Sequence, residues 1–578
     1  MLPPQSRSRA ALLTSLFAVG CLVFIYFTFT LVDHTRIDQL LDIPSSPYVE
    51  IIVPENHETW PYRVYKSSPV RPPNISINTY GGELAEGFLF LTPKGRGRQG
   101  VNQTAPFAFD SDGELVFAAN ATYGTTDFRV QTYRAQQHLT YWQGKSTGSP
   151  NPGHGYGVVT FLDSEYEEFN LSVKADINGI EDVDTEKKPG PAPGTIDIHE
   201  HDMTDRDTLL VTAYNNTPAN LSSMGGPEAG WIADSLFFEI DVATQDIIYR
   251  WSPLEHIPLN SSRLPVKSYM GSGTRSAPWD FFHTNSIQAI GSEYFLISSR
   301  HTWSIWLIAR HTGEVVCEFN GEDGGTFGAV PEGGHFRWQH HARAHNVTDT
   351  GFYLSLFDNH AMIQDPDSKR SSGLMFYFAL PPQRHQPPKL VKHLKVKGSH
   401  VKAPSQGSYQ ADVGRAKTQV LGYGQMPLTR EFGPEGELRM EAQYGYHDYV
   451  QSFRAFKQVW HATPKAWGPS LVLEEAGGKG DEERRIRAYV SWNGATDVES
   501  WHVFVVQKES GHAANGVRTP KEQASAVEED GHERFVGKAA KLGFETVFEL
   551  RVEESECVQV AAVRDGVALK RSEVVCLP

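Results

Sequence analysis

The sequence predicts an all-β protein with two folded parts behind an apolar N-terminal segment. The chain has 578 residues, which is too long for one hydrophobic core of ordinary size. Its 51 glycines, 35 prolines and 11% aromatic residues are typical of a turn-rich β protein. Apolar runs of strand length recur along the chain with turn residues between them. We therefore expect strands throughout, and one N-terminal helix.

The N-terminal helix is expected at residues 10–32, an apolar run without charge that is long enough to span a bilayer. The sequence shows neither the shorter apolar core nor the small-residue cleavage site of a signal peptide. Arg7 and Arg9 precede the run and Asp33 follows it, so the positive-inside rule makes residues 1–9 a cytosolic tail. The pattern predicts a single-pass transmembrane signal anchor, with the bulk of the chain lumenal or extracellular.

Glycosylation sequons favour the same orientation. One Asn-x-Ser/Thr triplet arises easily by chance in a chain rich in Ser and Thr, whereas eight after the apolar run indicate N-glycosylation in the secretory pathway. The eight acceptor residues are Asn74, Asn102, Asn120, Asn170, Asn215, Asn220, Asn260 and Asn346.

Charge and cysteine content exclude several classes of protein. The formal net charge of −16 argues against a nucleic-acid partner, which would require a basic face. Four cysteines are too few for a disulfide-rich scaffold, and no C-x-x-C zinc pattern occurs. Cys557 and Cys576 could form a disulfide between two late strands if the compartment is oxidising.

A weak internal repeat follows the expected stem and entry segment at residues 33–68. Residues 235–251 predict a hairpin, and residues 305–319 repeat its shape with a Thr-Gly turn. Shorter copies follow at 374–380 and 418–421. Such units at intervals of several tens of residues predict a β-propeller over residues 69–445, with loops gathered over a central channel.

The composition changes after the repeat. Residues 446–484 include a charged stretch that predicts a linker. Short apolar runs then recur over residues 485–578 and predict a β-sandwich-like domain of the immunoglobulin or fibronectin kind.

Several apolar runs end abruptly in polar residues. His283 and Asn285 are two residues apart and would share one face of a strand, and Arg300 ends the next run. A guanidinium beside an imidazole and an amide suits an oxyanion with trigonal oxygens. The alternative is a buried polar cluster that ties neighbouring blades together.

Three other patterns contain reactive residue types. Gln339-His340-His341 offers a nucleophilic imidazole, although either histidine could instead be a core residue. His199 and His201 could lie on one strand face and bind a metal, but spacing identifies no third ligand, so no metal is predicted. Gly144-Lys145-Ser146 lacks the earlier glycine of a P-loop, which makes it an ordinary loop.

Together the motifs resemble the arylsulfate sulfotransferase family, most closely its fungal branch, over about residues 69–445. They are Asp197-Ile198-His199-Glu200, Asp280-Phe281-Phe282-His283-Thr284-Asn285-Ser286, Ile297-Ser298-Ser299-Arg300-His301, Gln339-His340, Ala342-Arg343 and Leu356-Phe357-Asp358-Asn359. The resemblance implies a six-bladed propeller and nucleotide-independent transfer of a sulfuryl group between phenols through a sulfo-histidine, without a cofactor. It implies phenols and aryl sulfates as partners.

The same resemblance implies residue roles. His340 would be the nucleophile, and His199, His283, Asn285 and Arg300 would bind the sulfate oxygens. Four further residues are expected to bind substrate: His301, His341, Arg343 and Asn359. His199 or His301 would act as the proton carrier. The fungal branch usually has an acid after the Gln-His pair, where this chain has His341.

Two other functions remain open on the sequence alone. A non-catalytic, membrane-anchored propeller that acts as a binding module is favoured by His341 and by the second domain. A metal-dependent lumenal hydrolase would use His199, His201 and His340.

Overall fold

The computed structural model describes residues 42–95, 100–147, 152–175, 177, 194–362, 367–476, 484–508 and 533–577. The described chain confirms the all-β prediction. Its only helices are short: α2 (Pro253–His256) and the 3-10 turns η2 (Ser222–Met224), η3 (Leu259–Ser261) and η4 (Gly325–Phe327). The predicted anchor at residues 10–32 lies outside the described residues. Among those described, no helix is long and apolar enough to cross a membrane.

The chain divides into two compact units. The described parts of Val49–Trp467 and Asn493–Asp497 form the large unit. The described parts of Met1–Tyr48, Gly468–Trp492 and Val498–Pro578 form the small unit.

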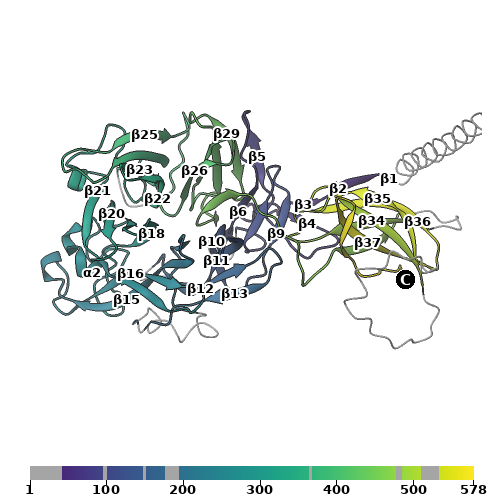
Figure 1. Cartoon of the computed structure of the whole chain (residues 1–578), viewed down its shortest axis with the longest axis horizontal. Coiled ribbons are helices and arrows are strands. Elements are labelled where there is room, and N and C mark those ends of the chain that lie inside the picture. Colours follow the sequence, from purple (N-terminus) through teal and green to yellow (C-terminus); the bar gives the residue numbers. More distant parts are fainter. Residues whose placement is uncertain are drawn as a thin grey trace, which may run out of the picture. The chain divides into compact units, whose positions relative to one another are not determined.

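The large unit contains six antiparallel sheets that follow one another in chain order (Figure 1). The first sheet is β31 (Ala455–Gln458), β6 (Phe88–Leu91), β8 (Phe107–Phe109) and β9 (Leu115–Ala118). The second is β10 (Gly124–Tyr133), β11 (Gln136–Ser146), β12 (Gly155–Leu162) and β13 (Glu168–Leu171). The third is β14 (His201–Met203), β15 (Thr208–Ala219), β16 (Gly230–Asp241) and β17 (Ile247–Trp251).

The remaining three sheets repeat this pattern. The fourth is β18 (Thr284–Ile290), β19 (Tyr294–Ser299), β20 (Ser304–Ala309) and β21 (Val315–Asn320). The fifth is β22 (His340–Thr348), β23 (Gly351–Asp358), β24 (Ser372–Ala379) and β25 (Lys389–Leu394). The sixth is β26 (Ser408–Val413), β27 (Thr418–Gly422), β28 (Leu428–Phe432), β29 (Leu438–Gln443) and β5 (Ser76–Thr79). Two further pairs are β3 (Glu50–Ile52) with β4 (Tyr62–Val64) and β7 (Lys94–Gly95) with β30 (Val450–Gln451).

Contacts between strands of neighbouring sheets join the six sheets in a closed cycle. β31 contacts β26 and β10, β10 contacts β14, β18 contacts β15, and β22 contacts both β18 and β26. Strands from both ends of the unit complete the cycle. β31 pairs with β6 through Ala455 and Leu91, and β5 pairs with β29 through Thr79 and Met440. These long-range pairs cover edges that a shorter chain would leave open.

Apolar side chains fill the spaces between neighbouring sheets. Phe161 and Phe238 share a buried cluster between the second and third sheets, and Phe319 and Phe376 share another between the fourth and fifth. Comparable clusters lie between the first and second, the third and fourth, and the fifth and sixth sheets. A small cluster of Ala85, Val413 and Val420 lies against the sixth sheet. Because the sheets are packed against neighbours on both faces, some of their strands are near-continuous apolar runs, for example β19, β20 and β24.

The small unit has two sheets. One is β1 (Asp42–Ile43), β35 (Glu533–Ala540), β34 (Ser500–Gln507), β37 (Glu556–Arg564) and β38 (Val567–Arg571). The other is β2 (Ser45–Tyr48), β36 (Glu545–Val552), β33 (Arg484–Ser491) and β32 (Ser470–Glu475). The buried Trp501 Nε1 on β34 donates to Thr546 Oγ1 on β36 at 3.0 Å, which links the two sheets. Cys557 and Cys576 form a disulfide in this unit.

Strands occupy both segments for which the sequence predicts connections. The expected stem at residues 33–68 contributes β1 and β2 to the small unit and β3 and β4 to the large one. The expected linker at residues 446–484 contains β30, β31 and β32. Four of these strands are short and pair with partners hundreds of residues away, so no local hairpin pattern marks them: β1, β2, β30 and β31. The other strands pair locally, β3 with β4 and β32 with β33.

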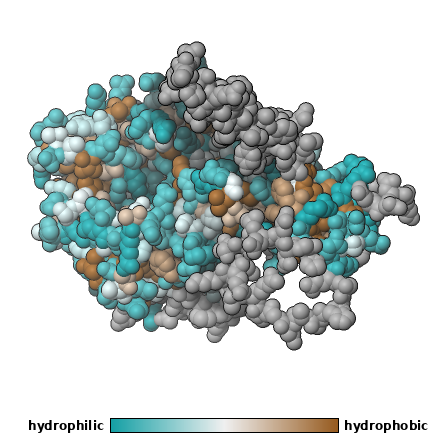
Figure 2. All heavy atoms as spheres, turned by 45° about the vertical axis from the view of Figure 1, so that its right-hand side comes forward, coloured by the Kyte–Doolittle hydropathy of each residue, from teal (hydrophilic) through white to brown (hydrophobic). Residues whose placement is uncertain are grey.

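The surface in view is mainly hydrophilic among the described residues, with hydrophobic side chains in separate small patches (Figure 2). Exposed large apolar residues occur singly along both units, for example Ile51, Val53, Tyr80 and Val567. Scattered apolar residues of this kind are normal on a protein surface.

Candidate functional site

A cavity of about 480 Å³ in the large unit is lined by four of the five residues for which the sequence predicts catalytic roles: His199, His283, Arg300 and His340. Apolar and amide side chains form other parts of its wall, among them Tyr269, Met270, Met362, Phe453 and Gln406. A volume in this range accommodates a small aromatic molecule, and the mixed wall suits a ligand with one apolar and one charged end.

His340 is held in one tautomer. Its Nδ1 lies 2.7 Å from Asn359 Oδ1 and 3.1 Å from the Trp338 carbonyl oxygen. The amide of Asn359 is oriented because its Nδ2 donates to the carbonyl oxygens of Ala403 and Gln406, at 2.8 and 2.9 Å. Both neighbours of Nδ1 are therefore acceptors, so Nδ1 carries the proton. The lone pair is then on Nε2, which accepts from the Gln406 N–H at 3.2 Å.

The surroundings of His340 keep its imidazole uncharged. Burial, followed by the positive charge of Arg300, holds the pKa of His340 well below its ordinary value. A neutral imidazole with an oriented lone pair is the form that acts as a nucleophile. Asn359, which the sequence analysis expects to bind substrate, contacts the opposite nitrogen and orients the ring.

Arg300 is fixed against the wall of the same cavity. Its Nη1 donates to Tyr269 Oη at 3.0 Å and its Nη2 donates to the Pro404 carbonyl oxygen at 3.1 Å. The guanidinium also lies over the Trp338 ring, 4.9 Å from its centroid. A guanidinium restrained in this way can stabilise an oxyanion without reorganising.

His301 lies behind Arg300 and does not line the cavity. Its Nδ1 donates to the Asp280 carbonyl oxygen at 2.7 Å, and its Nε2 lies 3.1 Å from Arg300 Nη1. Burial holds the pKa of His301 well below its ordinary value. Its two nitrogens are thus occupied by the backbone and by Arg300, so His301 positions the guanidinium.

His199 and His283 are each backed by a buried carboxylate. His199 Nδ1 lies 2.5 Å from Asp197 Oδ2, and His283 Nδ1 contacts Asp280 Oδ2. The two rings meet edge to face with centroids 4.7 Å apart. Burial, together with the neighbouring histidines, holds the pKa of His283 well below its ordinary value. With each Nδ1 occupied, the Nε2 atoms remain for a ligand in the cavity.

Asn285 does not line this cavity although the sequence analysis expects it on the same face as His283. His283 has a φ of 58°, and the pairing of β18 with β19 shifts register between Thr284 and Ser286. These two irregularities interrupt the strand alternation on which the expectation depends. The Asn285 side chain is buried and its Nδ2 donates to the Gln339 carbonyl oxygen at 2.6 Å.

His341 and Arg343 line a second cavity of about 450 Å³, together with Arg129, Asp202 and Tyr409. His341 has a φ of 54°, and the pairing of β22 with β23 shifts register between His340 and Arg343. Its Nδ1 lies 3.1 Å from the Tyr409 carbonyl oxygen. The two adjacent histidines therefore serve different cavities.

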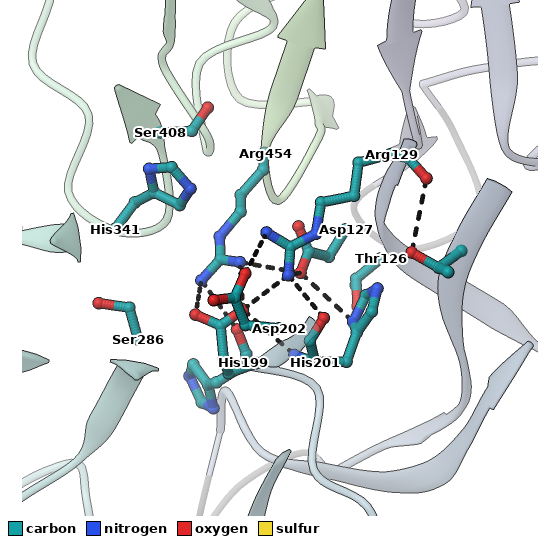
Figure 3. A network of polar contacts seen from close by, with 12 residues as sticks. Thr126, Asp127, Arg129, His199, His201, Asp202, Ser286, His341, Ser408 and Arg454 are labelled. Carbon is teal, nitrogen blue, oxygen red and sulfur yellow. Dashed lines mark hydrogen bonds and ion pairs between the residues drawn. The ribbon is translucent and has the colours of Figure 1, made fainter. Parts of the chain in front are cut away.

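A buried ion network connects the residues of the two cavities (Figure 3). Glu200 accepts from Arg343 at 2.7 Å, from Arg454 at 2.9 Å and from Arg129 at 3.0 Å. Arg454 also pairs with Asp127 at 2.8 Å and donates to carbonyl oxygens of His199 and Asn285, each at 3.0 Å.

The charges of this network balance. Burial raises the pKa of Glu200, but the three guanidiniums outweigh it and hold that pKa well below its ordinary value. Arg129, Arg343 and Arg454 face Asp127, Glu200 and Asp202, so the network contains equal numbers of cationic and anionic side chains. His201 contacts this network at 3.3 Å from Asp127 and does not line the first cavity.

Sequence reasoning missed several residues of the site. Arg454 lies in the segment predicted to be a linker, and His154 has no companion motif. Lys94 also lines the first cavity, and burial lowers its pKa to about 8. None carries a local sequence signal, since each reaches the site through pairing or packing with distant strands.

Comparison with known proteins gives one family match. The family model described as "Arylsulfotransferase (ASST)" matches residues 129–445, which is more than half of the chain. A comparison with curated proteins gives no match.

Three solved structures show weak similarity to the chain. A protein of unknown function from Bacteroides caccae is 9% identical, with a TM-score of 0.35, and the match covers 64% of this chain and all of that one. The GH43 protein BlXynB from Bacillus licheniformis is 8% identical, with a TM-score of 0.27 and coverages of 78% and 88%. A GH43 arabinoxylan arabinofuranohydrolase from Bacillus subtilis is 10% identical, with a TM-score of 0.24 and coverages of 90% and 95%. TM-scores this low support no statement about function.

Proposed function

The chain belongs to the arylsulfotransferase family, and from this premise we propose that it moves a sulfuryl group from an aryl sulfate to a phenol through a sulfo-histidine at His340. One observation carries the proposal. His340 is buried, its Nδ1 is bound by Asn359 Oδ1, and it lines a cavity that Arg300 also lines. Its Nε2 accepts the Gln406 N–H at 3.2 Å, and attack on sulfur would replace this hydrogen bond.

The first step forms the sulfo-histidine. His340 Nε2 attacks the sulfur of the aryl sulfate, a nitrogen–sulfur bond forms, and the ester oxygen–sulfur bond breaks to release a phenolate. In the second step the oxygen of the acceptor phenol attacks the same sulfur and loses its proton, and the nitrogen–sulfur bond breaks. His340 is restored, and no nucleotide takes part.

Charge develops mainly on the oxygens around sulfur, by analogy with phosphoryl transfer, so positioning and electrostatics supply most of the catalysis. Arg300 is the only arginine among the residues that line the described cavity, and it would hold the sulfuryl oxygens. Lys94 is the second cationic side chain in that lining. His283 would contribute from the same wall.

Proton transfer is assigned to His199. Its Nδ1 faces Asp197, which leaves Nε2 for a phenolic oxygen in the cavity. Burial opposes ionisation of Asp197, but the neighbouring His199 outweighs it and the pKa of that carboxyl lies below its ordinary value. A carboxylate that stays ionised stabilises the imidazolium formed when His199 accepts the phenol proton. His301 is less suitable because it does not line the cavity.

We infer that the six sheets of the large unit are blades of a β-propeller. The closed cycle of contacts between neighbouring sheets and the apolar clusters between successive sheets support this inference. His199, His283, Arg300 and His340 each precede or begin a first strand or follow a second one, which is where loops of one rim meet. The hydrolase alternative required His201, which does not line the cavity, so we do not adopt it.

Membrane anchoring and glycosylation also remain proposals. We infer the anchor from residues 10–32 and the secretory location from the sequons. The eight sequon asparagines are exposed or partly exposed, so each is accessible to a glycan. Digestion of the expressed chain with an N-glycosidase should increase its gel mobility, and an unchanged mobility would refute this part of the proposal.

A chromogenic assay tests the transferase proposal. The purified chain is incubated with 4-nitrophenyl sulfate, with and without a second phenol. Transfer predicts nitrophenol release that depends on the second phenol, with equal amounts of the new aryl sulfate formed. Release that is independent of the phenol and yields free sulfate would identify a hydrolase. No release with any aryl sulfate would favour the binding-module alternative.

A further inference from the structure

Two buried carboxylates beside the first cavity form no ion pair with an arginine or lysine of the described chain. Asp197 and Asp280 are 1% and 0% exposed. Within the described parts of the chain, their ion-pair contacts are with histidines only. Glu200, which is equally buried, forms ion pairs with three arginines. Buried carboxylates in proteins are normally paired with a cation or bound to a metal ion.

His154 lies between these carboxylates and is fully buried. Neither ring nitrogen has a hydrogen-bond partner among the described residues. Its Nε2 lies 3.2 Å from Asp280 Oδ2, and its ring centroid lies 4.0 Å from that of Tyr214 and 5.2 Å from that of His283. Asp280 Oδ1 and Tyr214 Oη also lack hydrogen-bond partners within the described chain. So many unsatisfied polar atoms in one place indicate a missing ligand.

The spacing of these groups suits a metal ion. His154, Asp280 and His283 can each present one ligand atom, and these atoms all lie within 4.8 Å of one another. His154, Asp197 and His199 form a second such triad. Two imidazoles and a carboxylate are the ligand set of many zinc sites and also suit other divalent transition metals.

The triad with Asp280 is the better candidate because its carboxylate has a free oxygen. Asp280 Oδ1 has no hydrogen-bond partner among the described residues. Asp197 uses both oxygens, since Oδ1 accepts from the Gly155 N–H at 2.9 Å and Oδ2 accepts from Thr212 Oγ1 at 3.2 Å.

We propose that His154, Asp280 and His283 bind one divalent transition-metal cation, of which Zn²⁺ is the simplest example. The two positive charges of the cation would balance the two negative charges of Asp197 and Asp280. No described arginine or lysine forms an ion pair with either carboxylate. Coordination through His283 Nδ1 fixes the remaining proton on His283 Nε2. Because His283 lines the cavity, its Nε2–H then becomes a hydrogen-bond donor toward a bound anion.

Metal analysis of the full chain tests this proposal without any substrate. The protein is dialysed against excess Zn²⁺ or Co²⁺, freed of loosely bound ions on a desalting column and measured by mass spectrometry of the elements. The wild type should retain one equivalent, and bound Co²⁺ should give a visible absorption spectrum. His154→Ala and Asp280→Asn should each retain less than a tenth of an equivalent.

His201→Ala is the matched control. His201 is also buried with two unpartnered nitrogens and lies 3.3 Å from Asp127, but Arg129 and Arg454 contact the same carboxylate. This variant should keep the full equivalent of metal. Circular dichroism and thermal melting check that each variant is folded. If His154→Ala does not fold, His154→Gln is used in its place.

Three results would overturn the proposal: a wild type that retains neither metal, a folded His154 variant that retains as much as the wild type, or loss of metal in Asp197→Asn but not in Asp280→Asn. The assay needs no aryl sulfate, so its outcome is independent of whether the chain transfers sulfuryl groups.

Discussion

Asn359 Oδ1 lies 2.7 Å from His340 Nδ1, and this contact decides that the lone pair of the imidazole is on Nε2. The Asn359 amide is itself oriented by two backbone carbonyl oxygens. The nucleophile proposed for sulfuryl transfer is thus positioned by a residue that sits behind it.

Asn359→Ala should therefore lower kcat with little change in KM. Loss of one oriented hydrogen bond of about 1.4 kcal/mol corresponds to roughly a tenfold loss of rate. Steady-state kinetics with 4-nitrophenyl sulfate and a phenol measure both constants. A rise in KM at constant kcat would mean that Asn359 binds substrate, as the sequence analysis expects.

Arg300→Ala should cost more, because the charge on the sulfuryl oxygens loses its fixed guanidinium. We expect a cost on the order of 3 kcal/mol, or about a hundredfold in kcat/KM. Arg250→Ala is a suitable control, since Arg250 is 45% exposed and pairs with Glu255 at the surface. Equal activity of the two variants would remove Arg300 from the proposed mechanism.

Lys94 should produce an alkaline limb in the pH profile. It lines the cavity and burial lowers its pKa to about 8, so its ammonium is present at pH 7 and is lost as the pH rises through 8. If that charge helps to hold the sulfuryl oxygens, kcat/KM should fall across this range in the wild type. The Lys94→Met variant should have a lower kcat/KM at pH 7, and its kcat/KM should not change as the pH rises through 8. An unchanged alkaline limb in the variant would assign the limb to another group.

Arg454→Met tests the ion network. Arg454 is buried and its loss leaves Glu200 and Asp127 short of a partner, which for a buried pair costs about 3–5 kcal/mol. Denaturant unfolding measures this free energy. The pKa of Glu200 is depressed in the folded protein, so the stability from its ionised form is present above the unfolded pKa and lost as the pH falls below it. The loss on acidification should be smaller in the variant, and identical acid profiles would contradict the assignment.

The sequence predicted what depends on local pattern. Apolar runs marked strands such as β16 and β24, and turn residues marked the hairpin of β20 and β21. The strand predictions succeed because burial on a strand is a property of neighbouring residues. Four of the residues in the family motifs line one cavity, and their roles there stay a prediction.

The sequence did not predict features that depend on distant pairing or local backbone irregularity. β31 and Arg454 lie in a polar segment with short strands. Their position in the fold follows from the pairing of β31 with β6. From the sequence, His341 would be expected to act with its neighbour His340. It has a φ of 54°, however, and lines the second cavity instead. His154 has no motif around it, and its position follows from packing against Tyr214.

The most direct test of the sulfo-histidine is a labelling experiment without acceptor. The wild type is mixed with an aryl sulfate labelled in its sulfate, quenched and digested, and the peptide that carries His340 is examined by mass spectrometry. The proposal predicts label on that peptide, its loss when a phenol is added, and no label in His340→Ala. His311→Ala, which changes a histidine that is 73% exposed, should be labelled like the wild type. Turnover by a wild type that is never labelled, or label on a folded His340→Ala variant, would contradict the account.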